Sequence, residues 1–129
     1  MTDNEEKINS YSHTGCVPTL SFSPDGNFLA SGSWDKTVQI VSVADNFNEV
    51  AFYRHKHFVE SLSFSSDGEY LASGGTDKIV QIVAVQNSFR TVAQYSHGGQ
   101  VNRVVFSTTG EYLASGDSEG IVKIMCSVK

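Results

Sequence analysis

Histidine, serine and acidic side chains recur in this sequence in sets that could support catalysis. In a serine hydrolase, a histidine takes the proton of the serine nucleophile and a carboxylate orients that histidine. Such a site needs one activated nucleophile in one cleft, whereas here the set occurs three times. We therefore predict a repeated structural network of hydrogen bonds and no catalytic residue. Its predicted members are His13, Ser31 and Asp35; His55, Ser73 and Asp77; and His97, Ser115 and Glu119.

Two of the histidines also suggest a metal pair. His55 and His57 lie two residues apart, and His13 and His97 stand a full repeat away on either side. A zinc site needs further ligands that converge on one ion, and residues from separate repeats are too far apart to supply them. We predict no metal site and no cofactor. The turn glycines match no phosphate-binding motif either.

The chain is built from a repeat of 42 residues, which the spacing of His13, His55 and His97 defines. A fixed period of this size specifies a repeat architecture. The repeats run without an insertion, so the whole chain of 129 residues is expected to form one domain. The other landmarks in phase are Val17, Val59 and Val101; Phe22, Phe64 and Phe106; Gly26, Gly68 and Gly110; and Gly32, Gly74 and Gly116.

Each repeat alternates short β-rich runs with turn residues, which is typical of strands. In the first repeat we predict strands over residues 17–23, 28–32, 37–43 and 49–53. The first turn contains Pro24, Asp25 and Gly26, and proline presets φ while glycine permits positive φ. The sequence therefore predicts four antiparallel strands in each repeat.

The three repeats resemble the WD-repeat (WD40) family, whose members form β-propellers of four-stranded blades. The resemblance rests on HTGCVPTLSFSPDGNFLASGSWDKTVQI, HKHFVESLSFSSDGEYLASGGTDKIVQI and HGGQVNRVVFSTTGEYLASGDSEGIVKI. It implies that the histidine, serine and acidic sets form the structural network of each blade. The sequence departs from the family at two positions: the glycine before the histidine is Ser12, Arg54 or Ser96, and the tryptophan that serves the network as a donor is Val41, Val83 or Met125.

The resemblance implies an all-β propeller domain over residues 1–129, with blade 1 at about 14–54, blade 2 at about 56–96 and blade 3 at about 98–129. Ile8 and Tyr11 precede Val50 and Tyr53 by one period, so a strand over residues 6–12 is expected to complete blade 3, in the same chain or in a partner chain. Propellers have about four to eight blades. We therefore expect a head-to-tail homodimer that closes a six-bladed ring, with an arc of a larger propeller as the alternative.

The resemblance also places a set of residues on the top face of the propeller, where partners bind. Trp34 precedes the acidic residue of its turn, and a solvated turn has no core reason to hold an indole. Exposed aromatic side chains are typical anchors for a partner. We expect Trp34 and Phe58 to lie close together and to bind a protein or peptide partner. The alternative is that Trp34 packs over its own blade and Phe58 over the neighbouring loop. The other expected members are Cys16, Pro18, Glu60, Thr76, Gln100, Asn102 and Ser118.

Composition excludes several functions. The formal net charge is −5 and no basic cluster is present, which argues against binding nucleic acid. No apolar run has the length of a membrane span, and the N-terminal residues do not resemble a secretory signal. Two cysteines without a disulfide framework fit the cytoplasm or nucleus. We therefore expect a non-catalytic scaffold, with an arc lacking independent function as the alternative and an enzyme or small-molecule binder using the central channel as a third reading.

Overall fold

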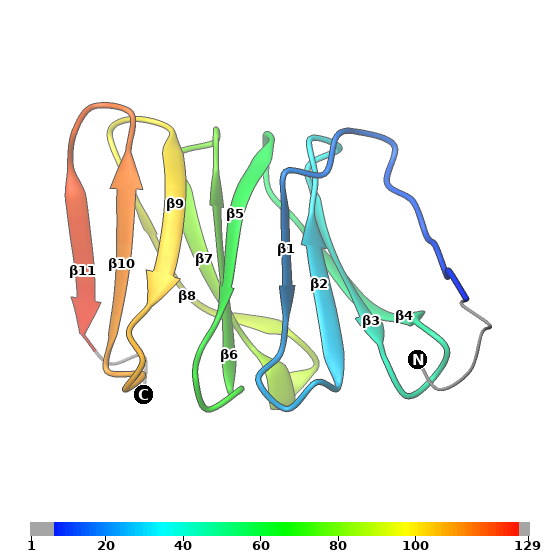
Figure 1. Ribbon diagram of the computed structural model, residues 1–129. Coiled ribbons are helices and arrows are strands. Elements are labelled where there is room, and N and C mark those ends of the chain that lie inside the picture. The colour runs from blue at the N-terminus through cyan, green and yellow to red at the C-terminus, as the bar shows by residue number, and fades with distance from the viewer. Residues whose placement is uncertain (1–6, 127–129) are drawn as a thin grey trace.

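The structure is a computed structural model that describes residues 7–126, and its strands form three antiparallel sheets placed side by side (Figure 1). We call the sheets blades 1, 2 and 3. Blade 1 contains β1 (Thr19–Phe22), β2 (Phe28–Gly32), β3 (Thr37–Ser42) and β4 (Asn48–Arg54). Blade 2 contains β5 (Val59–Phe64), β6 (Tyr70–Gly75), β7 (Ile79–Ala84) and β8 (Arg90–Ser96), with the short 3-10 helix η1 (Val85–Asn87) before β8. Blade 3 contains β9 (Val101–Phe106), β10 (Tyr112–Asp117) and β11 (Val122–Cys126).

The strands of the first repeat lie where the sequence predicts them. β2 has the predicted bounds, β3 ends one residue earlier, and β4 is one residue longer at each end. β1 is shorter than predicted because it pairs with β2 only from Thr19 to Phe22. Gly26 has a φ of 77° in the turn between β1 and β2, which is the positive φ that glycine readily adopts.

The core lies between consecutive sheets. Val38 and Ile40 on β3 have no exposed surface, and they belong to the same apolar cluster as Val59 and Leu62 on β5. A second apolar cluster joins blade 2 to blade 3. Each blade thus buries its apolar faces against its neighbours, which is the arrangement expected of stacked repeats.

Hydroxyl groups and glycines fix the distance between blades. The Leu62 amide donates to Thr19 Oγ1 at 3.1 Å, and one repeat later the Val104 amide donates to Ser61 Oγ at 3.1 Å. A Cβ on Gly32 would lie 2.6 Å from Cγ1 of Val59, so glycine allows this close approach. The same contact recurs between Gly74 and Val101, also at 2.6 Å. The two junctions are therefore built alike.

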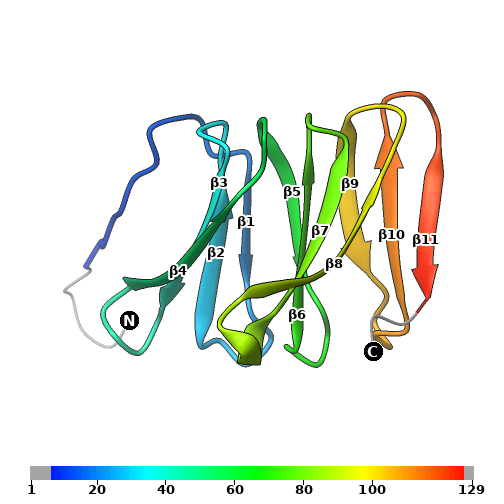
Figure 2. The ribbon, with the colours of Figure 1, turned by 180° about the vertical axis from the view of Figure 1, so that it is seen from behind.

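The expected strand at the N-terminus is not formed within the described chain. Residues 7–12 carry no strand assignment, residue 6 lies outside the described residues, and blade 3 has three strands. A strand exists only where it pairs with a neighbour, and the third blade lies at the opposite end of the arc from this segment (Figure 2). In a single chain, residues 7–12 therefore cannot reach β11.

The described helical structure is limited to one turn. Among residues 7–126, no helix is long and apolar enough to cross a membrane.

Candidate functional site

The histidine of each repeat lies at the centre of a buried chain of hydrogen bonds. In blade 2, His55 Nδ1 lies 2.9 Å from Asp77 Oδ2 and His55 Nε2 lies 2.8 Å from Ser73 Oγ. Tyr53 donates its hydroxyl proton to Ser73 Oγ at 2.9 Å. The side chains of His55 and Asp77 are almost fully buried. Tyr53 lies on β4 and His55 in the loop that follows it, whereas Ser73 lies on β6 and Asp77 in the β6–β7 turn.

The donors and acceptors of this series of hydrogen bonds match when they are followed from Tyr53 to Asp77. Tyr53 donates to Ser73, so the serine hydroxyl has its own proton available for Nε2 of His55. Nδ1 then carries the ring proton and donates to the Asp77 carboxylate. Each acceptor in this series thus receives a hydrogen bond. Among the described residues, no buried side-chain nitrogen or oxygen atom lacks a hydrogen-bond partner.

The same chain is present in the other two blades. In blade 1 the histidine lies 2.9 Å from its carboxylate and 2.7 Å from its serine, and the tyrosine–serine distance is 2.8 Å. In blade 3 the corresponding distances are 2.9, 2.7 and 2.7 Å. The members are Tyr11, Ser31, His13 and Asp35 in blade 1, and Tyr95, Ser115, His97 and Asp117 in blade 3.

Blade 3 corrects one prediction. The repeat places Glu119 opposite His97, but the carboxylate that contacts His97 belongs to Asp117. Asp117 ends β10 and also accepts from the Glu119 and Ile121 amides, at 2.9 and 3.0 Å. The short side chain of Asp117 therefore binds His97 and also accepts the amides of the turn that follows β10. Glu119 contributes its backbone amide to the network. Its side chain lies near Gly98 and Gly99 in the preceding loop.

The tyrosines are members that the sequence analysis missed. Their period was noted only as evidence for an outer strand, whereas the structure shows that each hydroxyl group is hydrogen-bonded to a network serine, with Tyr11 and Tyr53 as donors. The family's tryptophan donor is absent from all three repeats. The tyrosine hydroxyl supplies a donor to the serine in its place. Three tyrosines at the histidine period, two residues before each histidine, were the available signal.

The network holds its carboxylates in the ionised form. Burial acts to raise the pKa of Asp35, but hydrogen bonds from the Thr37 hydroxyl and amide, His13 and the Thr14 amide lower this pKa to about 2. The pKa of Asp117 is also about 2, chiefly because the Ile121 amide donates to it. At Asp77, burial acts to raise the pKa of the carboxyl group. The hydrogen bond and the charge of His55 lower it, and the pKa of Asp77 lies below its ordinary value.

The loops above the network form one face of the molecule, at the upper end of the sheets in Figure 1. Each turn between the second and third strands of a blade donates an amide to the loop that leads into the first strand. The Trp34 amide donates to the Cys16 carbonyl at 2.9 Å, and the Thr76 amide donates to the Phe58 carbonyl at 2.9 Å. The Ser118 amide contacts the Gln100 carbonyl at the same distance. These hydrogen bonds tie each turn to the loop that precedes the first strand of the same blade.

Trp34 and Phe58 lie together on this face, as the sequence predicts. Their ring centroids are 4.9 Å apart and the ring planes differ by 11°, so the rings are stacked. Trp34 is 42% exposed and Phe58 is 38% exposed. Trp34 comes from the β2–β3 turn of blade 1 and Phe58 from the loop before β5 of blade 2. The pair therefore spans the junction of two blades and leaves much of its surface to solvent. We call it the aromatic pair.

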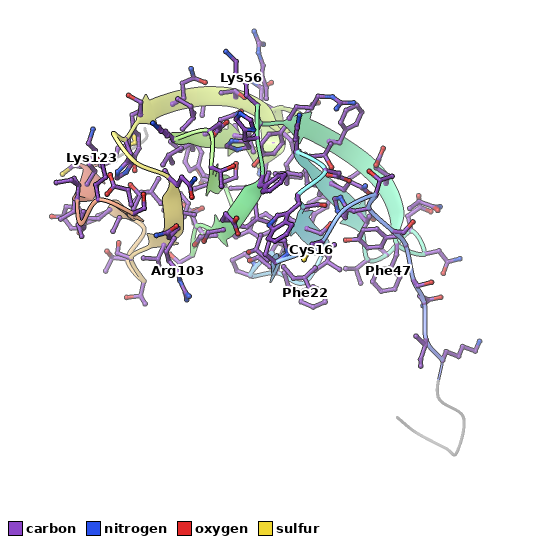
Figure 3. The ribbon with its side chains drawn as sticks, turned by 90° about the horizontal axis from the view of Figure 1, so that it is seen from above. Cys16, Phe22, Phe47, Lys56, Arg103 and Lys123 are labelled. Atoms are coloured by element: carbon purple, nitrogen blue, oxygen red, sulfur yellow. The ribbon has the colours of Figure 1, made fainter. Side chains whose placement is uncertain are left out.

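Three other predicted residues lie apart from the aromatic pair. Pro18, Glu60 and Asn102 line a cavity of about 330 Å³ along the inner strands β1, β5 and β9, with Arg103 among the other lining residues. Viewed from above in Figure 3, Arg103 lies on the concave side of the arc and Lys56 on its convex side. The expected site is thus divided between the loop face and the inner strands.

The histidines do not gather around one point. Each of the three network histidines contacts the carboxylate of its own blade, and His57 is exposed on a loop. Within residues 7–126, no three His, Cys, Asp or Glu side chains are placed so that they could hold a metal ion.

Comparison with known proteins agrees with this geometry. A family profile described as WD domain, G-beta repeat (WD40) matches residues 5–42, 48–83 and 89–124. A stretch of 28 residues is 64% identical to Periodic tryptophan protein 2 homolog of Schizosaccharomyces pombe (strain 972 / ATCC 24843), covering 22% of this chain and 3% of that protein. Two solved structures, titled "Structure of U3-55K" and "Crystal structure of RRP9 WD40 repeats", superpose with TM-scores of 0.84 and 0.83.

Both solved structures are 24% identical to this chain, and each match covers 90% of this chain and 37% of the other. The chain therefore spans less than half the length of those structures and a small part of the curated relative. At this identity the likeness shows the fold. Because the family profile matches all three repeats, the chain belongs to the WD40 (WD domain, G-beta repeat) family.

Proposed function

We propose that this chain is a non-catalytic interaction module that binds a protein or peptide partner on its loop face, at the aromatic pair. The observation that carries the proposal is the stacked geometry of Trp34 and Phe58, whose rings remain substantially exposed. Aromatic side chains provide a large contact area and lose little rotamer entropy on binding, so they dominate many interfaces. The pair offers a partner a flat apolar platform.

The surroundings of the pair support this role. The Phe58 amide donates to Thr76 Oγ1 at 3.0 Å, and the Gln100 amide donates to Ser118 Oγ at 3.1 Å. These side-chain contacts add to the backbone contacts that tie each turn to its neighbouring loop. A surface that is already ordered loses less entropy on association. A partner therefore meets the loop face in its binding conformation.

The network is the alternative place for chemistry, and its geometry favours a structural role. Both ring nitrogens of His55 are engaged, by Asp77 and Ser73, and the serine oxygen also accepts from Tyr53. The same arrangement repeats in all three blades. A nucleophile must reach its substrate, whereas these serines are buried. The chain belongs to the WD40 family, and we propose that it acts as a non-catalytic scaffold.

The end faces of the arc imply further blades. Apolar side chains are exposed on both ends, and large exposed apolar surface on a repeat protein favours association. We propose that these ends are covered by propeller blades, either from a second copy of this chain or from further repeats of a longer chain. Each match covers 37% of the solved propeller, so this chain alone supplies only part of such a ring. Further 42-residue periods in the adjacent coding sequence would establish the second candidate.

We propose the cytoplasm or the nucleus as the location. Cys16 and Cys126 are both free and exposed, and exposed thiols persist in a reducing compartment. A fluorescent fusion of the full chain tests this: signal in secretory vesicles would contradict it.

Selection from a displayed peptide library tests the binding role. The wild-type chain is the bait, and the selected peptides are then bound to a Trp34→Ala/Phe58→Ala variant. A Phe52→Ala variant is the matched control, because Phe52 is an exposed aromatic residue that lies on the outer strand β4 and is not part of the aromatic pair. We expect selected peptides to lose binding to the double variant and keep it with the control. Peptides that bind the double variant unchanged, or a selection that enriches none, would contradict the proposal.

A further inference from the structure

The two ends of the arc expose the two kinds of blade surface that pack against each other wherever consecutive blades meet. Leu20 in blade 1 is 63% exposed, whereas its counterpart Leu62 in blade 2 is 8% exposed. At the other end, Ile124 in blade 3 is 63% exposed, whereas its counterpart Ile82 in blade 2 is 0% exposed. Further apolar side chains exposed in the same way are Val17 and Phe22 at the blade 1 end and Val122 at the blade 3 end.

The N-terminal segment occupies the place of the outer strand of a blade that would precede blade 1. Tyr11 contacts Ser31 of blade 1 just as Tyr53 of β4 contacts Ser73 of blade 2, at 2.8 and 2.9 Å. Gln39 Nε2 donates to the Ser12 carbonyl at 3.5 Å. The equivalent contacts inside the arc are Gln81 Nε2 to the Arg54 carbonyl at 2.9 Å and Lys123 Nζ to the Ser96 carbonyl at 2.7 Å. The segment is thus positioned as an outer strand, and residues 7–126 contain no other strand of that blade.

Blade 3 has the complementary feature, a free edge where an outer strand belongs. β11 is the last strand of its sheet, whereas β3 and β7 are covered by β4 and β8. A cavity of about 410 Å³ lies along this edge. It is lined by Gln94, Tyr95, Lys123, Ile124 and Met125. Exposed sheet edges bind extended segments through main-chain hydrogen bonds.

We propose that two copies of this chain form a closed ring of six blades, in which residues 7–12 of each copy pair with β11 of the other. Each chain carries both the strand and the edge that accepts it, and both end faces repeat a contact already made twice inside the arc. Propellers have about four to eight blades, so two copies of three blades give a closed ring and three copies exceed the range. This self-association is independent of the partner proposed for the loop face.

The internal blades fix the register of the exchanged strand. β8 pairs with β7 so that Tyr95 faces Val80 and Gln94 faces Gln81. β4 pairs with β3 in the same register, with Tyr53 opposite Val38. One repeat further, Tyr11 of one copy faces Val122 of the other and Ser10 faces Lys123. The apolar side of β11 is then covered, and its free backbone groups are paired.

Gly116 provides an independent indication of the second copy. Gly32 and Gly74 have no room for a Cβ, because Val59 and Val101 of the following blade fill that space. Gly116 is their counterpart, yet within the single chain a Cβ there would meet no atom within 4 Å. In the ring, Val17 of the second copy takes the place of Val59 and Val101. The open space at Gly116 is where that side chain fits.

One feature of the internal junctions is not repeated between copies. Thr19 and Ser61 accept an amide proton from the following blade, and their counterpart in blade 3 is Arg103. Arginine has no acceptor atom in its side chain, so this hydrogen bond is lost. Apolar contact and strand pairing therefore hold the copies together, and the junction between copies is weaker than the junctions inside each arc.

Light scattering coupled to size exclusion measures the mass of the full chain. The expected mass is twice the 14.0 kDa of one chain. A Gly116→Val variant places a side chain where Val17 of the second copy would lie, so we expect it to have the mass of one chain and unchanged β-sheet circular dichroism. Thr108→Val, on an exposed turn of the same blade, is the matched control and keeps the double mass. A wild-type mass of one chain, a polydisperse assembly, or a Gly116→Val variant that keeps the double mass would overturn the proposal.

Disulfide trapping tests the register. In a chain whose native cysteines are replaced by serine, we introduce Ser10→Cys together with Lys123→Cys. Residues directly opposite in an antiparallel pair have Cα atoms about 4.5–5.5 Å apart, which suits a disulfide. We expect a covalent dimer on oxidation. The control pair Asn9→Cys with Lys123→Cys lies on opposite faces of the strands and should remain unlinked. Equal trapping of both pairs, or of neither, would overturn the exchanged strand.

Discussion

Removal of the Asp77 carboxylate tests the network most sharply. Asp77 Oδ2 lies 2.9 Å from His55 Nδ1 and accepts from the Lys56 amide at 3.1 Å. Its other oxygen accepts from the Ile79 amide at 3.1 Å. An Asp77→Ala substitution deletes both acceptor oxygens and with them all three hydrogen bonds. The His55 side chain has no exposed surface, so water cannot replace the lost contact there.

The magnitude follows from the donors left behind. A buried donor without a partner costs about 1–3 kcal/mol. The Lys56 amide lies at an exposed residue, so water can satisfy it at little cost. We therefore expect Asp77→Ala to lower the free energy of unfolding by about 1–3 kcal/mol, with His55 as the main source. The loss is large compared with the stability of a typical domain.

Urea unfolding, followed by circular dichroism at one fixed protein concentration, measures the change. Asp45→Ala is the matched control, because Asp45 is an exposed aspartate in the turn between β3 and β4. Exposed substitutions of this kind usually change stability by less than about 0.5 kcal/mol. If Asp77→Ala and Asp45→Ala have the same midpoint, the carboxylate does not hold the histidine and the reasoning fails.

Three further outcomes follow from the same structure. Gly74→Ala should lower the melting temperature, because the new Cβ would lie 2.6 Å from Cγ1 of Val101 and overpacking costs about 1–3 kcal/mol; an unchanged melting temperature would show that the blades can separate. The pKa of Asp35 is lowered from 3.8 to about 2, so its contribution to stability is present above about pH 4 and is lost as the pH falls towards 2. In an acid titration, an Asp35→Asn variant should therefore lose less stability over this range than the wild type, and equal losses would contradict this. Phe58→Ala should shift the fluorescence emission of Trp34, the chain's one tryptophan, to longer wavelength because the indole loses its stacking partner, and an unmoved emission maximum would argue against the stack.

The repeat makes most of the fold predictable from the sequence. A period of 42 residues and turn residues such as Gly26 located the strands of each blade to within two residues. The same period brought together the histidine and serine of each network. It also placed Trp34 and Phe58 on adjacent loops. These features depend on local sequence and on the stacking of equivalent units, both of which the repeat contains.

The remaining features depend on geometry that the period does not carry. Glu119 occupies the expected place in sequence, but the shorter Asp117 at the end of β10 reaches His97 while it also binds the turn amides. The N-terminal segment has the pattern of an outer strand, yet it needs a partner edge that its own chain holds at the far end of the arc. Tyr11 and its equivalents were recognised by their spacing, but their hydroxyl contacts required the folded structure.

The central claim is that a partner binds at the aromatic pair, and the indole resonance of Trp34 tests it most directly. The chain contains one tryptophan, so its indole N–H gives one peak in a proton–nitrogen correlation spectrum. The account predicts that this peak shifts as a selected peptide is added and saturates with the binding curve measured by calorimetry. A peptide that binds by calorimetry and leaves the indole peak unmoved would place the binding site elsewhere on the molecule.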